Sequence, residues 1–297
     1  MLLIIMLENI KFKKILKYII IVENFLIVFL LIFLVSKNFN NYKEKFFSYF
    51  SKIDIFVLDN LNYFLFSLIS LALVISISII IWRIIFKTFN YKKSLSEIFH
   101  LYLKIFFKRL FSPLGPISPL INIEEDIKKS TLIYSSYIFF ITLGSILFFS
   151  VIFILSWPIL MLVIPFFIYL IYNSFKKLNL KISKKDFFLL LFFSYLNEFF
   201  SYACFFYSTK IFDLNMNLID SVYIYLVWVI TSSLFPFLYG SGASEIVSII
   251  LANSFGYDGA LFTLSIIYYR FIITYLSLIL FIFNIKNIFK FRKIKTF

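Results

Sequence analysis

The segment FPFLYGSG, residues 235–242, interrupts a long apolar stretch with one proline and two glycines. A second interruption, SPLGPISP, occupies residues 112–119 and holds three of the six prolines in the chain. Proline removes a backbone donor and clashes with the preceding helical turn, and glycine weakens a helix, so each segment ends one helix and starts another. We therefore predict that residues 96–123 and 220–255 each form two half-helices joined at a bend. Each is expected to be a re-entrant hairpin that enters and leaves the membrane on one side.

The composition of the chain indicates lipid as its solvent. Of the 297 residues, 62% are hydrophobic and 15% charged, whereas soluble proteins carry about 25% charged residues. An apolar run of about 18 or more residues is long enough to cross the hydrocarbon core. Six such runs are predicted to cross the membrane: residues 15–35, 61–86, 131–156, 157–175, 187–208 and 260–285. We expect an all-α integral membrane protein with six transmembrane helices and two re-entrant helical hairpins.

Several function classes are excluded by what the sequence lacks. Cys204 is the single cysteine and His100 the single histidine, so zinc sites built from Cys and His pairs are excluded. Polar stretches such as residues 36–60 are too short to fold as a soluble catalytic domain. We expect no metal, no cofactor and no nucleic-acid partner, and we interpret the net charge of +14 as a topology signal.

The distribution of positive charge predicts how the chain is oriented. Cytoplasmic flanks collect Lys and Arg, and the predicted hairpins place 23 of these 29 residues on the cytoplasmic side and five outside, with Arg270 within a span. Both termini are then cytoplasmic, in a multi-pass protein of the cell (inner) membrane. Trp82 and Trp157 fall at span ends, where we expect them to anchor at the membrane interface.

The order of spans and hairpins predicts an inverted repeat. Residues 1–156 hold two spans, a hairpin entering from the cytoplasm and a third span, while residues 157–297 repeat this order with a hairpin entering from outside. Pro113 and Pro236 lie 123 residues apart, close to the offset between equivalent spans. Inverted repeats with broken helices near the midplane are typical of transporters. The alternative is two chance kinks in ordinary helices.

Glu245 and Arg270 are predicted to lie at similar depth. If the helices that carry them are joined at residues 257–258, both lie roughly 19 Å from the outer turn, near the middle of a hydrocarbon core about 30 Å thick. An unpaired charge at that depth costs about 2.5 to 3.5 kcal/mol, so the two should pair or face a water-filled cavity. The pair is either a structural salt bridge or a headgroup site with a movable counter-ion.

The second bend also provides a candidate anion site. Gly240 and Gly242 allow close backbone approach, and the half-helix that follows points its free N–H groups into the membrane interior, where anions bind. Ser241 and Ser244 would add hydroxyl donors, and Glu245 lies in the first turn, where its carboxylate could simply cap the helix. The segment lacks the lysine of a nucleotide-binding P-loop.

Glu198 falls in the middle of the span at residues 187–208. A carboxyl group buried in a helix bundle suits either a proton-coupled step or an inert hydrogen bond between helices. We favour the inert role from the sequence.

The residues around the second bend resemble a known family. The pair FP at 235–236, the segment GSGASE at 240–245 and the triplet YYR at 268–270 resemble the transmembrane flippase region of the lysylphosphatidylglycerol synthase family. In that family a proline- and glycine-rich break ends in Gly-x-x-Glu, and an arginine sits in the next span. The segment SPLG at 112–115 resembles the earlier motif of the family. The resemblance covers nearly the whole chain and implies translocation of a lipid headgroup, in a form without the additional synthase domain.

The residues we expect to bind substrate combine these lines of reasoning. They are Pro113, Gly115, Glu198, Pro236, Gly240, Ser241, Gly242, Ser244, Glu245 and Arg270. We expect no catalytic residue.

Three functions remain open from the sequence. The first is a lipid flippase that moves a phospholipid or aminoacyl-phospholipid headgroup between leaflets, with a membrane phospholipid as substrate and a separate synthase protein as possible partner. The second is the membrane component of a phosphatidylglycerol lysyltransferase or other lipid-linked transferase. The third is a polyprenyl-phosphate carrier with the same architecture.

Overall fold

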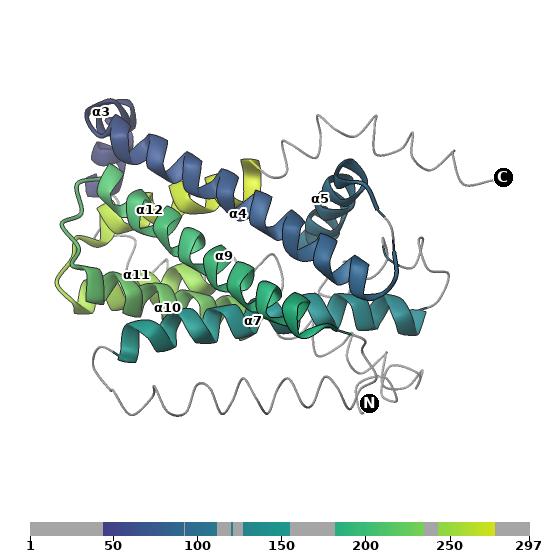
Figure 1. Cartoon of the computed structure of the whole chain (residues 1–297). Coiled ribbons are helices and arrows are strands. Elements are labelled where there is room, and N and C mark those ends of the chain that lie inside the picture. The colour runs from purple at the N-terminus through teal and green to yellow at the C-terminus, as the bar shows by residue number, and fades with distance from the viewer. Residues whose placement is uncertain are drawn as a thin grey trace, which may run out of the picture. The chain divides into compact units, whose positions relative to one another are not determined.

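The computed structural model describes residues 44–91, 93–111, 120, 127–154, 182–234 and 243–276. Within these ranges the chain consists of helices and turns, without a strand. Residues 44–50 are helical, and the α-helices that follow are labelled in Figure 1. They are α3 (Ile53–Asp59), α4 (Leu61–Thr88), α5 (Leu95–Phe111), α7 (Ile127–Ile154), α9 (Lys184–Ile211), α10 (Leu218–Leu234), α11 (Ala243–Ser254) and α12 (Gly259–Arg270), and the π-helix η2 (Phe271–Leu276) follows α12.

Three of the described helices are long and apolar enough to cross a membrane. They are α4, α9 and the part of α7 from Ser130 to Ile152. At 1.5 Å per residue, the 28 residues of α4 or α9 extend about 42 Å. The all-helical class is confirmed, and the predicted spans at 61–86, 131–156 and 187–208 are helices over most of their length.

The remaining predicted spans and bends are described only in part. The spans at 15–35 and 157–175 lie outside the described residues, and the span at 260–285 is described as α12 and η2 to residue 276. The predicted bends at 112–119 and 235–242 also lie outside them. The number of crossings therefore stays a prediction.

The chain divides into two compact units, each formed by segments distant in sequence. The first unit comprises residues 1–61, 109–113 and 209–267, and the second comprises residues 62–108, 114–208 and 268–297.

In the second unit α4 and α9 run antiparallel. Lys87, near the end of α4, forms a salt bridge with Asp186 at the start of α9, at 3.0 Å. Tyr63, near the start of α4, stacks on Tyr207 near the end of α9, with ring centroids 6.2 Å apart. Contacts at both ends therefore fix the direction of one helix against the other.

In the same unit α7 and α9 run parallel. Phe140 of α7 contacts Phe187 near the start of α9, with centroids 5.7 Å apart. Phe148, two turns further along α7, contacts Tyr202, which lies about four turns further along α9, at 5.5 Å. The direction of α4 is thus opposite to that of α7 and α9.

The core of the second unit also includes α5 and corrects one expectation. Ile98 and Ile105 of α5 belong to the same buried cluster as Trp82 of α4. Trp82 is 1% exposed and stacks on Tyr137 of α7, with centroids 4.4 Å apart. The expectation that Trp82 anchors at the membrane interface is therefore wrong, because neighbouring helices cover its ring.

A capping box defines the start of α5, and the side chain of Ser183 caps the start of α9. At α5, Glu97 accepts a hydrogen bond from the backbone N–H of Ser94 at 2.9 Å, and the backbone N–H of Glu97 donates to Ser94 Oγ at 3.3 Å. At α9, the backbone N–H of Asp186 donates to Ser183 Oγ at 3.0 Å. These bonds satisfy donors that the first helical turn leaves without intrahelical partners.

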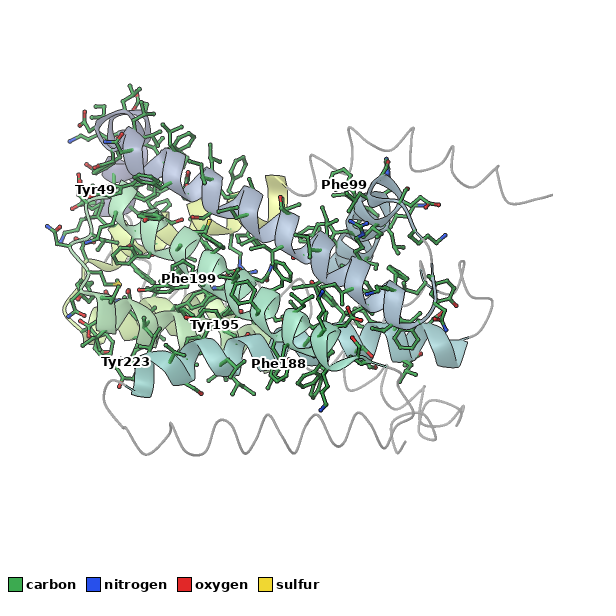
Figure 2. The ribbon with its side chains drawn as sticks, viewed as in Figure 1. Tyr49, Phe99, Phe188, Tyr195, Phe199 and Tyr223 are labelled. Carbon is green, nitrogen blue, oxygen red and sulfur yellow. The ribbon has the colours of Figure 1, made fainter. Side chains whose placement is uncertain are left out.

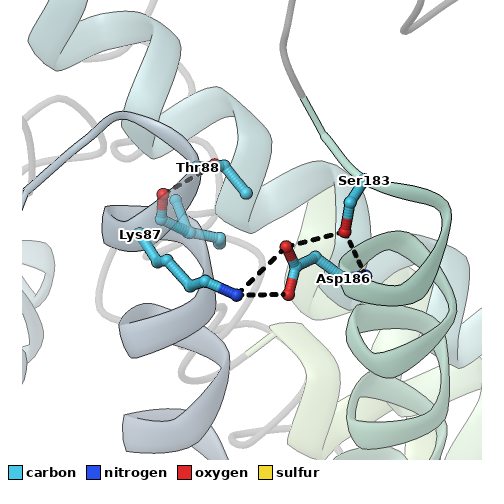
Figure 3. A network of polar contacts seen from close by, with 5 residues as sticks. Lys87, Thr88, Ser183 and Asp186 are labelled. Carbon is cyan, nitrogen blue, oxygen red and sulfur yellow. Dashed lines mark hydrogen bonds and ion pairs between the residues drawn. The ribbon is translucent and has the colours of Figure 1, made fainter.

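Asp186 joins the start of α9 to the end of α4 (Figure 3). Its carboxylate accepts hydrogen bonds from Ser183 Oγ at 2.8 Å and from Lys87 Nζ at 3.0 Å. Asp186 precedes the apolar part of α9. Burial raises the pKa of this carboxyl group, but the hydrogen bonds from Ser183 and Lys87 and the charges of Lys87 and Lys185 outweigh burial, so its pKa lies below the ordinary value.

Asp186→Asn is expected to lower stability at neutral pH by roughly 1 kcal/mol, the size of a helix-capping interaction. Because the pKa of Asp186 is lower in the folded than in the unfolded state, its contribution is full above the unfolded pKa. The contribution is lost as the pH falls through the folded pKa. Thermal unfolding in detergent across this acidic range measures the effect, with the exposed Asp59→Asn as control. A difference from wild type that is the same at all pH values would contradict this account.

Gly144 brings α7 close to α9. A Cβ atom added at Gly144 would overlap the backbone carbonyl group of Ser194, which belongs to α9. Small residues permit this approach between membrane helices, which increases dispersion contacts along the interface.

Gly144→Ala is expected to destabilise the second unit, because the added methyl group meets backbone rather than a movable side chain. Overpacking of this kind costs about 1 to 3 kcal/mol. The melting temperature in detergent measures the loss. Val151→Ile, which adds one carbon atom to an exposed position of the same helix, is the control and should melt like wild type.

Candidate functional site

The middle of α9 carries two buried polar side chains. Asn197 and Glu198 lie at the centre of the 28-residue helix, and each is 7% exposed. Other positions of α9 carry exposed aromatic rings, such as Phe188 and Phe199, which suit contact with acyl chains (Figure 2). The polar pair therefore faces the bundle rather than the surface.

Asn197 bonds to α4. Its Nδ2 donates hydrogen bonds to the backbone oxygen of Val74 at 3.0 Å and to Ser78 Oγ at 2.9 Å. Val74 lies near the middle of α4, so the contact joins the centres of the two antiparallel helices.

Glu198 bonds to α7. Ser145 Oγ donates to Glu198 Oε2 at 2.9 Å and lies 3.2 Å from the backbone oxygen of Ile141. The interhelical hydrogen bond considered for Glu198 is therefore present. Adjacent residues of α9 thus fasten it to two different helices.

Ser244 and Glu245 lie at the start of α11. Glu245 is in the first helical turn, and Ser244 Oγ donates to Glu245 Oε2 at 3.1 Å. Ser244 is fully buried, as are Ser248 and Ala252 at intervals of four residues along α11. Gly240, Ser241, Gly242 and Pro236 lie outside the described residues, as do Pro113 and Gly115.

Arg270 is a buried cation at the end of α12. It is 7% exposed and immediately precedes η2. Two neighbours secure this part of the helix within the second unit: Tyr268 bonds to Ser67 of α4 at 3.0 Å, and Tyr269 contacts Phe205 of α9. Since Glu245 belongs to the first unit and Arg270 to the second, their pairing stays a prediction.

A hydrogen bond that the sequence did not predict joins the start of α10 to the end of α11. The helices pack against each other, and Tyr257, after α11, donates through its hydroxyl to Asp220 Oδ2, in the first turn of α10, at 2.7 Å. The backbone N–H of Asn217 donates to the same hydroxyl at 3.2 Å. The start of α10 and the end of α11 therefore lie at one end of the pair.

Burial and charge keep the Tyr257 hydroxyl protonated, so that it can donate to Asp220, because both raise its pKa. Burial raises the pKa of Tyr257, and so do its hydrogen bond to Asp220 and the negative charge of that carboxylate. Asp258 next to it forms a 4.0 Å salt bridge with Lys45. The sequence indicated only the local contacts here. The three-residue spacing of Asn217 and Asp220 is typical of a helix start, and the backbone N–H of Asp220 donates to Asn217 Oδ1. Asp258 Oδ1 likewise accepts from the backbone N–H of Ala260 at 2.8 Å.

Tyr257→Phe is expected to loosen the first turn of α10, because the hydroxyl that Asp220 and Asn217 contact is removed. A lost hydrogen bond to a charged group corresponds to about tenfold faster amide exchange when opening is local. Hydrogen exchange of residues 218–222 measures this. Tyr49→Phe, in the same unit, is the control, and equal exchange in the two variants would contradict the expectation.

The described residues include no group of three or more His, Cys, Asp or Glu side chains that could hold a metal ion. Comparison with protein-family models finds no match, and comparisons with curated proteins and with solved structures find no significant match. The functional argument therefore depends on the geometry of the chain.

Proposed function

We propose that this protein is a lipid transporter that moves a phospholipid or aminoacyl-phospholipid headgroup between membrane leaflets. The observation that carries the proposal is the Tyr257–Asp220 hydrogen bond, which holds the start of α10 next to the end of α11. With 17 residues, α10 is about 26 Å long, and with 12 residues α11 is about 18 Å long. Because the start of α10 and the end of α11 lie together, a re-entrant hairpin that enters and leaves the membrane on one side suits this pair.

The helix directions support the predicted topology. The charge distribution requires the spans represented by α7 and α9 to run outward and the span represented by α4 to run inward. The contacts give α4 the opposite direction to both. We propose six crossings in two inverted repeats, residues 1–156 and 157–297, with both termini on the cytoplasmic side of the cell membrane.

The proposed headgroup site combines a helix start with a guanidinium group. The start of α11, with Ser244 and the preceding glycines, would bind the lipid phosphate through backbone N–H groups. Arg270 would bind the same phosphate, and Glu245 would pair with Arg270 when the site is empty or accept a cationic headgroup. Rocking of the two repeats would expose the site to each leaflet in turn.

The substrate class follows from this chemistry. A phosphate with an attached cation, as in an aminoacyl-phospholipid, matches one guanidinium and one carboxylate, which agrees with the resemblance to the lysylphosphatidylglycerol synthase family. A separate synthase protein would then supply the aminoacyl-lipid.

Replacing both Glu245 and Arg270 by alanine is expected to slow headgroup transfer at least about tenfold, since the loss of one charged hydrogen bond exceeds 1.4 kcal/mol. Transfer of fluorescent phosphatidylglycerol and its lysyl derivative is measured in proteoliposomes by quenching from outside.

The double variant Glu44→Ala, Lys52→Ala changes exposed charges outside the site and is the matched control. Folding is monitored for all variants by melting in detergent. Equal transfer rates in wild type and in folded Glu245→Ala, Arg270→Ala would refute the assignment.

A further inference from the structure

Glu198 is a buried acid in the middle of the long apolar helix α9. It lies about 20 Å from either end of α9, and its side chain faces the bundle. An ionised carboxylate is disfavoured in such a place unless it is paired, whereas a neutral carboxylic acid is tolerated. A rearrangement of the bundle that changed the exposure of Glu198 would therefore change the balance between its ionised and its neutral form.

Ser145 can serve either protonation state of Glu198. Its hydroxyl oxygen lies 2.9 Å from Glu198 Oε2 and 3.2 Å from the backbone oxygen of Ile141. When Glu198 is ionised, the Ser145 hydroxyl donates to the carboxylate. When Glu198 is protonated, the carboxyl O–H donates to Ser145 Oγ, and the hydroxyl hydrogen turns to Ile141. Both arrangements satisfy all donors without moving a heavy atom.

A second hydroxyl lies on the same side of α9. Ser194, one turn before Glu198, is 1% exposed, and its Oγ has no hydrogen-bond partner among the described residues. It lies where Gly144, the neighbour of Ser145, lets α7 come close to α9. The interface between α7 and α9 thus carries two hydroxyls and one carboxyl within about one helical turn.

Few charged groups lie on the helices packed against Glu198. The side chains described on α7, residues 130–152, are uncharged, with Tyr134 and Tyr137 as titratable groups. On α4, Lys87 binds Asp186 at the helix end, and Arg83 lies one turn before it. On α12 the groups are Tyr268, Tyr269 and Arg270, and on α9 itself they include Tyr195, Tyr202 and Cys204.

We propose that Glu198 is a proton-binding site and that proton movement through it drives the transporter. The carboxylate takes a proton from water on one side of the membrane, forming its O–H bond, and returns the proton to water on the other side after the repeats rock. The coupling rests on the proposed transport function, whereas proton binding at Glu198 does not.

The first experiment detects the proton itself. In infrared spectra of the full chain in proteoliposomes near neutral pH, wild type should show the carbonyl band of a protonated carboxylic acid, shifted in heavy water. Glu198→Gln, which keeps the side-chain shape, should lack the band, and Ser145→Ala should shift it. Glu44→Gln, at an exposed position, and Ser136→Ala, a serine that bonds within α7, should leave it unchanged. A band that persists in Glu198→Gln would overturn the proton site.

The second experiment tests the coupling. If one proton accompanies each lipid, a difference of one pH unit should shift the leaflet ratio of transported lipid by up to about tenfold. Glu198→Gln should still transfer lipid down its gradient but should not respond to pH.

The two experiments distinguish a failure of the proton coupling from a failure of the transport function. A wild-type leaflet ratio that ignores the pH difference would overturn the coupling. A wild-type protein that transfers no headgroup would overturn the transport function, while the infrared band would still decide whether Glu198 binds a proton.

Discussion

Polar side chains in a bundle of helices apolar enough to span a membrane need partners on other helices, and α9 meets this constraint at its centre. Asn197 bonds to α4 and Glu198 to α7, so one turn of one helix determines the rotation of three helices about their axes. A rotation of α9 that exposed these groups to acyl chains would leave an amide and an acid without partners, at a cost of several kcal/mol. The aromatic contacts on either side, such as those of Trp82 and Phe148, then fill the interface that these bonds define.

The first unit uses polar contacts in a different way. Its bonds gather where helices start and end: Asp220 with Tyr257, Asp258 with Lys45, and Asn60 with Ile211 and Asp213. Polar groups at the ends of membrane-spanning helices reach water and headgroups, so contacts at such ends link segments without placing charge in the hydrocarbon. In the second unit, hydrogen bonds at the middle of α9 therefore fix how the helices are rotated about their axes. In the first unit, bonds between helix ends fix where the chain turns.

The sequence predicted what depends on composition and local spacing. The spans predicted at 61–86 and 187–208 follow from hydropathy and lie within α4 and α9, and the first-turn position of Glu245 follows from the glycines before it. The partners of Glu198 and Asp220 lie 53 and 37 residues away, and no local pattern encodes such pairs. The prediction that Trp82 lies at the membrane interface was wrong because it considered only the position of Trp82 along the span. Burial of Trp82 depends on which face of α4 meets α7. The lipid headgroup site remains a proposal built on residues from both units.

The π-helix η2 has a consequence for the helix that carries Arg270. Hydrogen bonds from residue i to i+5 place one more residue in a turn than an α-helix holds, and one extra residue rotates all later side chains by about 100°. Tyr269, just before η2, packs on Phe205, whereas Phe271 at the start of η2 is exposed. Reversion of this wide turn to regular α-geometry would revolve η2 against α12, a screw motion that needs no hinge.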